Sequence, residues 1–281
     1  MDGWLGQTGG LDGLGFAQNL NFANGARLTY ATTTSITIET GMCNDDTNAI
    51  TLINLAPLTV NLAVSGVGGL DTGVVAANTT YHVWLIYNPV ANLRAGLFSL
   101  SDTTPILPAG YTYKRRLGGI RTTDASILYN FRMFGEGRER TVIYRAPIRS
   151  IPGGTIGTGL VNANAGGLVI NNILDATGAW TDTKLWTGGG NIAAPASWLI
   201  PSFTRHGIFW VQFYGAANGA NLFICEKGIT PMVGMTHLYG TTVWREHEFE
   251  MSISATGEIQ YYAVTAGSYV HIAVRGYRFT L

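Results

Sequence analysis

The stretch Tyr81-His82-Val83-Trp84-Leu85-Ile86-Tyr87 lies within a longer segment, Gly69 to Asp124, that decides the fold of this 281-residue chain. The stretch is rich in aromatic and β-branched residues, which suit a pleated, half-buried surface. Asn88-Pro89 ends it, because proline has no N–H to give a sheet ladder and its φ is fixed. Residues 95–100 return as a second strand, so the pattern predicts a β-hairpin.

The same segment continues with a loop and a basic strand. Residues 102–110 contain Pro105 and Pro108, which favour a fixed loop. Lys114-Arg115-Arg116 then leads into residues 117–121, which we expect to be strand. The residues of this segment predict structure and no chemistry.

The string GLDTG…YHVWLIYNP…GLFSLSDTTPILPAGYTYKRRLGGIRTTDAS resembles a module found in virion proteins of tailed bacteriophages, which are described as tail-fibre or virion structural proteins. The earlier string MCNDDTNAI resembles part of the same module, so the resemblance covers about residues 25–130. The resemblance implies a β-rich, oligomeric component of a phage particle, with no catalytic residues to carry over. From Ile151 onward, the pattern of residues is the only guide.

The composition favours an all-β protein that shares its surface with partners. Charged residues make up 12% of the chain, 17 basic and 17 acidic residues cancel, and lysine occurs only at Lys114, Lys184 and Lys227. A dispersed monomer usually carries a charged surface with a net charge away from zero. We therefore expect a homo-oligomer, with a trimer favoured, although an ordinary neutral β domain remains the alternative.

We expect an all-β fold of two β-sandwich or jelly-roll-like domains with an irregular N-terminal arm. Residues 1–26 form the arm, 27–147 the first domain, 148–167 a Gly- and Pro-rich linker, and 168–281 the second domain. Strands are predicted at 28–30, 35–39, 51–53, 58–64, 81–87, 95–100, 126–134, 138–145, 197–200, 207–214, 221–226, 247–253, 259–264 and 269–275.

The arm carries scattered apolar residues without a helical or strand period. We expect it to order against a neighbouring subunit, or else against its own domain. Its predicted interface residues are Trp4, Leu5, Leu11, Leu14 and Phe16.

Candidate catalytic and metal-binding residues are few. Cys43 and Cys225 have no metal-ligand spacing, and two buried free thiols are favoured over a disulfide. The five histidines lie in five separate segments, so no catalytic residue and no cofactor is predicted. Asp45 and Asp46 could offer oxygen ligands to Ca²⁺. Such side chains more often bond their own backbone in a turn, which is the interpretation we favour.

Basic residues concentrate in the middle of the chain. Nine of the 17 lie within 36 positions, at Lys114, Arg115, Arg116, Arg121, Arg132, Arg138, Arg140, Arg145 and Arg149. A nucleic-acid groove is one interpretation. Glu136 and Glu139 lie among these arginines and the total charge is zero, so salt bridges between subunits are favoured. The predicted interface residues of this group are Arg115, Arg116, Arg138 and Arg140, and no nucleic-acid partner is expected.

Neither a secretory signal nor a membrane span is expected. A secretory signal begins with a basic region, and no basic residue precedes Arg27. Residues 48–70 are uncharged, but polar residues interrupt them with near period-two regularity, which indicates strands rather than a membrane helix.

The leading hypothesis is a non-enzymatic phage virion protein, in a tail fibre or a capsid decoration, located on the particle and in contact with other virion proteins. The alternative is a lectin-like module that binds a host glycan, in which loop aromatics would stack on sugar rings. Its candidate residues are Trp180, Trp186, Tyr239 and Trp244, for which ordinary packing is the simpler explanation. A capsule depolymerase is third, since the chain is short and lacks long β-helix repeats.

Overall fold

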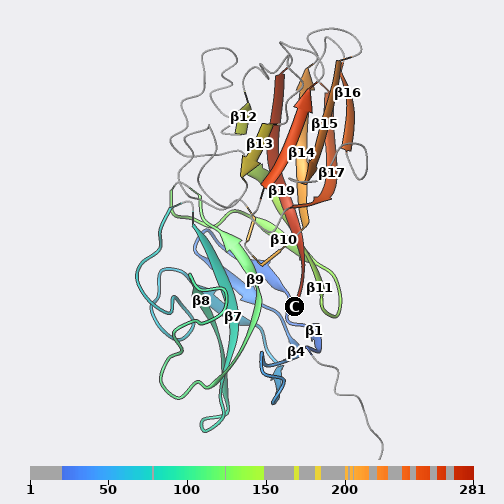
Figure 1. Cartoon of the computed structure of the whole chain (residues 1–281). Coiled ribbons are helices and arrows are strands. Elements are labelled where there is room, and N and C mark those ends of the chain that lie inside the picture. The colour runs from blue at the N-terminus through green and yellow to red at the C-terminus, as the bar shows by residue number, and fades with distance from the viewer. Residues whose placement is uncertain are drawn as a thin grey trace, which may run out of the picture.

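The computed structural model is built of β-strands (Figure 1). It describes residues 21–148 except Asn78 and Asp124, and then residues 168–170, 181–184, 200–201, 203–204, 206–214, 220–226, 236–240, 245–253, 258–263 and 269–281. All regular structure in these segments is strand, which confirms the predicted all-β class. Within them, no helix has the length and hydropathy to span a membrane.

The strands up to residue 148 are β1 (Ala23–Gly25), β2 (Leu28–Tyr30), β3 (Ser35–Ile38), β4 (Gly41–Asn44), β5 (Thr51–Asn54), β6 (Leu58–Asn61), β7 (Thr80–Asn88), β8 (Leu93–Ser99), β9 (Tyr113–Arg121), β10 (Phe131–Phe134) and β11 (Glu139–Ile148). Those that follow are β12 (Leu168–Ile170), β13 (Thr181–Lys184), β14 (His206–Tyr214), β15 (Ala220–Glu226), β16 (Thr236–Gly240), β17 (Arg245–Ser252), β18 (Glu258–Ala263) and β19 (Tyr269–Thr280).

One antiparallel sheet runs through both halves of the chain, in the order β17-β14-β19-β11-β10-β2-β3-β6, with β12 beside β19. The long strand β19 makes the connection, because it pairs with β14 on one side and with β11 on the other. Residues 274–280 were expected in the second domain, but they pair with β11 and so lie in the same sheet as strands of the first domain. The boundary between two domains at residues 148–167 stays a prediction, and β19 pairs with strands from both sides of that boundary.

Three smaller sheets accompany it among the described residues. The sheets β1-β4-β5 and β8-β7-β9 lie in the first half, and the sheet β13-β18-β15-β16 lies in the second (Figure 1). In the first half the layers approach closely at Gly96 of β8, where an added Cβ would meet Val60 of β6 at 2.1 Å. In the second half, Ile224 of β15 belongs to the same buried cluster as Phe209 and Val211 of β14.

The predicted hairpin forms the centre of the first half. Along β7, Tyr81, Val83 and Leu85 face the main core, whereas Trp84 and Ile86 belong to a second buried cluster. That second cluster includes Tyr111 and has Leu107 packed against it, so the loop between β8 and β9 covers the outer face of the sheet.

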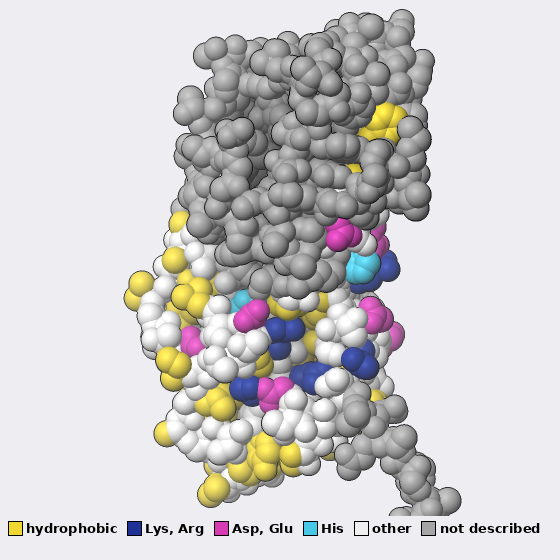
Figure 2. All heavy atoms as spheres, viewed as in Figure 1, with side chains coloured by type: hydrophobic (Ala, Val, Ile, Leu, Met, Phe, Trp, Pro, Cys, Tyr) yellow, Lys and Arg dark blue, Asp and Glu magenta, His cyan; other side chains and the backbone are white. Residues whose placement is uncertain are grey.

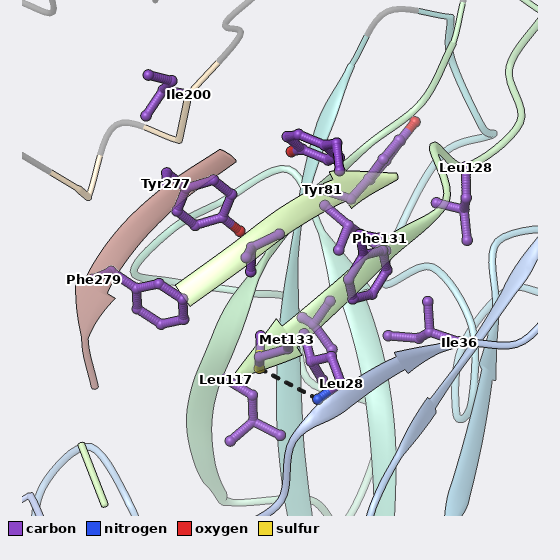
Figure 3. Close-up of a cluster of buried hydrophobic side chains, with 14 of the residues drawn as sticks. Leu28, Ile36, Tyr81, Leu117, Leu128, Phe131, Met133, Ile200, Tyr277 and Phe279 are labelled. Carbon is purple, nitrogen blue, oxygen red and sulfur yellow. Dashed lines mark hydrogen bonds between the residues drawn. The ribbon is translucent and has the colours of Figure 1, made fainter. Parts of the chain in front are cut away.

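The last strand closes the main core (Figure 3). Tyr277 and Phe279 of β19 lie among the same buried side chains as Leu117 of β9 and Met133 of β10. Met133 also accepts a hydrogen bond through Sδ from the backbone N–H of Leu28, at 3.4 Å. The core of the first half therefore needs side chains from the far end of the chain.

Residues 21–26, predicted as the last part of the N-terminal arm, belong to the fold. Residues 23–25 form β1, which pairs with β4, and Ala23 and Ala26 are both buried. The predicted contact residues Trp4, Leu5, Leu11, Leu14 and Phe16 lie outside the described residues.

Candidate ligand-binding site

A pocket opens beside β9, on the face of the first half shown in Figure 2, where basic and acidic side chains lie together in a hollow. Its volume is about 270 Å³. The residues that line it come from several distant segments: Asn21, Asp46, Trp84, Asp102, Thr103, Arg115, Arg116 and Leu281.

A β-bulge sets the position of the two arginines. Val83 pairs with Gly118 and Trp84 pairs with Arg116, so Leu117 is an extra residue on β9. A bulge of this kind bends its strand and redirects side chains. Arg115 and Arg116 are consecutive residues of β9, and both side chains line the pocket.

Arg116 is held from two sides. Its guanidinium lies 4.0 Å from the centre of the Phe203 ring, and its Nη1 donates to the main-chain oxygen of Asp102 at 2.6 Å. Stacking on an aromatic ring and a fixed acceptor together restrict the planar group to one orientation. Arg116 is thus positioned before any ligand arrives.

Arg115 is almost fully inside the protein, with 5% of its surface exposed. Its Nη1 donates to Oδ1 of Asn21 at 3.1 Å. Burial lowers the pKa of Arg115, but an arginine remains protonated in proteins. The pocket wall therefore contains a buried positive charge whose hydrogen-bond acceptor is a neutral amide.

Lys114 and Asp46 form an ion pair at the pocket rim. The backbone N–H of Asp46 also donates to the carbonyl of Lys114 at 2.9 Å, which ties the 45–50 loop to the edge of β9. The ammonium group of Lys114 lies 5.1 Å from the centre of the Trp84 ring.

Asp45 stabilises a turn. It is buried, and its carboxylate accepts hydrogen bonds from the backbone N–H of Ile50 at 2.9 Å and of Thr47 at 3.1 Å. Burial would raise the pKa of Asp45, but the hydrogen bonds from Ile50 and Thr47 outweigh burial and lower it. The geometry fits the turn interpretation of Asp45, whereas the carboxylate of Asp46 pairs with Lys114. Across the described residues, no group of three or more His, Cys, Asp or Glu side chains could hold a metal ion.

His82 is buried on the same side of β7 as Trp84. Its ring lies 5.5 Å from that of Phe203. Burial first, and then the charge of Arg116, lower the pKa of His82 to about 4, while Asp102 opposes the shift. His82 is therefore neutral at pH 7 and serves as packing behind Arg116.

The arginines predicted to lie at an interface differ in burial. Arg140 is buried, and its two Nη atoms donate to the main-chain oxygens of Gly25 and Gly135 at 2.8 and 3.0 Å. Arg115 and Arg140 are therefore internal to this chain and are not exposed interface residues. Arg138 remains accessible, with its Nε donating to the oxygen of Leu281 at 3.2 Å.

The remaining candidates from the sequence are the two cysteines and the predicted glycan-binding aromatics. Cys43 and Cys225 are both free and buried, as predicted. Burial raises the pKa of Cys43 to about 12, so its thiol is neutral. Trp180, Trp186 and Trp244 lie outside the described residues, and the side chain of Tyr239 lies outside the described side chains, so the structure places none of the predicted glycan-binding aromatics.

Sequence reasoning singled out Arg115, Arg116 and Asp46, the last as a weak metal candidate, but it did not bring them together in a pocket. Asn21, Asp102 and Leu281 carry no sequence signal, because they meet β9 only in the folded chain. The local signal is the basic run Lys114-Arg115-Arg116 at the start of β9.

Comparisons with known proteins give no family. No family model matches the chain, and no curated protein matches it. Among solved structures, the chain is weakly similar to a Bacillus thuringiensis Cry1Da tryptic core variant, with a TM-score of 0.21 and 7% sequence identity. The match covers 92% of this chain and 51% of that structure, so the chain spans about half the length of the structure it matches. A likeness at this TM-score carries no argument about fold or function.

Proposed function

We propose that this chain is a non-enzymatic structural protein of a bacteriophage virion, in a tail fibre or a capsid decoration. It assembles as a homo-oligomer, with a trimer favoured, and contacts other virion proteins. The observation that carries the proposal is a set of apolar side chains exposed on loops of an otherwise well-packed β fold with few charges. The resemblance of residues 25–130 to phage virion proteins supports the same conclusion.

Most of the exposed apolar residues lie in loops between strands. Val90 is 95% exposed and Leu93 56% exposed, at the tip of the β7–β8 hairpin, and Leu55 is 86% exposed between β5 and β6. Burying one such side chain fully contributes about 1.5–3 kcal/mol. Several of them, contacted together by a neighbouring subunit, would make a stable interface.

The continuous sheet suits an extended appendage. Two domains joined only by a linker move relative to each other by default. Here β11, β19 and β14 form one hydrogen-bonded ladder across both halves. A particle component built in this way transmits force through backbone hydrogen bonds rather than through a flexible connection.

Light scattering coupled to size-exclusion chromatography tests the assembly. The full chain is compared with a chain that starts at Asn21, because Asn21 bonds to Arg115 and Asn48 and must be kept. We expect a discrete oligomer for the full chain and a smaller species for the shortened one. A monomer for both at every concentration would contradict homo-oligomerisation.

The hairpin tip is tested in the same experiment. Replacing Val90 and Leu93 by aspartate should weaken the oligomer, since more than half of each side chain is exposed in the single chain and is free to contact a neighbouring subunit. Thr72→Asp is the matched control at another exposed position, and it should assemble normally. The virion assignment is tested separately by mass spectrometry of purified particles of a phage that encodes the chain, where the protein should be found in fixed proportion.

A further inference from the structure

We propose that the pocket beside β9 binds a small hydroxylated carboxylate of the sugar-acid class through the guanidinium groups of Arg115 and Arg116. Both side chains line a cavity of about 270 Å³ together with an indole, an amide, a hydroxyl and two carboxylates. This site is independent of the assembly proposed above and uses none of the predicted glycan-binding aromatics.

Arg115 forms no direct ion pair among the described residues, although the charges of Asp45 and Asp46 act on it from a longer distance. Lys114 is paired with Asp46, and Arg140 is bonded to two main-chain carbonyls. Among the described residues, no carboxylate lies within ion-pair distance of Arg115. A buried charge without a counter-charge in direct contact is costly, so an anion bound at this point would relieve that cost.

The form of the two arginines favours a carboxylate. A guanidinium presents parallel N–H donors that match the two oxygens of a carboxylate. Arg116 is already fixed by Phe203 and by the Asp102 carbonyl, so little conformational freedom is lost on binding. The carboxylates of Asp46 and Asp102 in the wall disfavour a dianion such as phosphate, and a single negative charge fits better.

The remaining wall suits the hydroxyl groups and ring of a sugar. Asn21 and Thr103 bring an amide and a hydroxyl to the lining, and Trp84 adds an apolar side chain to the wall. The cavity is slightly smaller than the roughly 300 Å³ at which drug-sized sites begin. It therefore admits a single sugar acid rather than an extended chain.

Isothermal titration of the full chain with glucuronate tests the proposal. Glucose is the neutral ligand of matched size, and inorganic phosphate is the anion without a ring. We expect saturable binding of glucuronate and weak or no binding of the other two. Absence of saturable glucuronate binding, or equal binding of glucose, would overturn the proposal.

Variants locate the site. Arg115→Gln and Arg116→Gln should each weaken glucuronate binding about tenfold or more, because each removes a charged donor. Arg132→Gln, at an exposed position of β10, is the matched control and should bind normally. Since Arg115 is buried, its variant could fail to fold. Thr103→Trp therefore fills the pocket from an exposed loop position, and unchanged binding in that variant would overturn the site.

The methyl glycoside of glucuronate separates two sources of the ligand. Binding of the glycoside means that the pocket accepts an acidic residue at the end of a glycan. Binding of the free acid alone means that it takes a soluble sugar acid. Either result supports the site, and neither depends on the oligomeric state measured above.

Discussion

The hydroxyl of Tyr277 contacts both backbone polar groups of Gly119, which lies 158 residues earlier in the chain. It accepts a hydrogen bond from the N–H of Gly119 at 3.3 Å and donates one to the carbonyl oxygen of the same residue. Tyr277 belongs to β19 and Gly119 to β9. This contact joins the last strand to the segment that organises the first half, beside the packed ring of Phe279 (Figure 3).

Replacing Tyr277 by phenylalanine should destabilise the fold by about 1–3 kcal/mol, because the change leaves buried backbone groups without a partner. Burial raises the pKa of Tyr277 well above its ordinary value, so the hydroxyl remains a donor at all moderate pH values. Urea denaturation should show a lower midpoint with an unchanged slope. Tyr30→Phe, at a half-exposed position of β2, is the control and should unfold as the native chain does.

Gly96 is required by the contact between two sheets. An added Cβ would lie 2.1 Å from Cγ2 of Val60 and 2.9 Å from Cδ1 of Ile38. Val60 is stiff because it is β-branched, so Gly96→Ala should cost about 1–3 kcal/mol through overpacking. The change is measured as a fall in the denaturant midpoint.

A second substitution separates this steric effect from an effect on the backbone. Val60→Ala opens space beside Gly96, so the double variant should lose less stability than the sum of the single losses. Strict additivity of the two losses would contradict the steric explanation.

His82 should make stability depend on pH between about 4 and 6.5. The pKa of the folded state, about 4, lies below the ordinary value of 6.5, so the unfolded chain binds the proton more readily. Stability therefore falls as the pH is lowered through this window, by up to roughly 3 kcal/mol. Above pH 6.5 the histidine is neutral in both states and contributes no pH dependence.

The contribution is isolated by comparing pH profiles of the unfolding free energy. His82→Gln should show a flatter profile than the native chain between pH 4 and 6.5. His247→Gln, at an exposed position of β17, should keep the native profile. Identical slopes for His82→Gln and the native chain would show that burial of His82 does not control this window.

Asp45 should contribute to stability as a turn residue rather than as a metal ligand. Asp45→Ala removes the acceptor of the Ile50 and Thr47 hydrogen bonds, and we expect a loss of about 1–3 kcal/mol. Asp45→Asn keeps an acceptor oxygen and should lose less. Millimolar Ca²⁺ should leave the Tm of the native chain unchanged, because a ligand raises Tm only when it binds the folded state.

Much of the first half was predictable from local pattern. The alternation in residues 35–39 and the aromatic run in 81–87 predicted β3 and β7, and the structure confirms both. Shorter strands were missed. β1 and β4 contain glycine and carry no periodic signal, and they form because each pairs with a neighbour in space. The predicted strand at 126–134 is shortened to β10, since Leu128 makes only an isolated bridge.

The site was predictable only in part. The concentration of basic residues at 114–116 was visible, but their roles were not. An arginine next to a run of apolar residues predicts an interface as readily as an internal contact. Arg140 is held inside the protein by hydrogen bonds to the carbonyl oxygens of Gly25 and Gly135. Arg115 is held inside by its hydrogen bond to Asn21.

The sequence by itself determined the all-β class, the hairpin at residues 81–100 and the two free buried thiols, because strand patterns, turn residues and apolar character are local properties. The tertiary structure alone decided that β19 closes the core of the first half and that one sheet crosses the expected boundary. It also decided that residues as distant as Asn21, Asp102 and Leu281 meet around Arg115 and Arg116. Pairing between distant strands depends on the packing of the whole chain, which no short stretch of residues encodes.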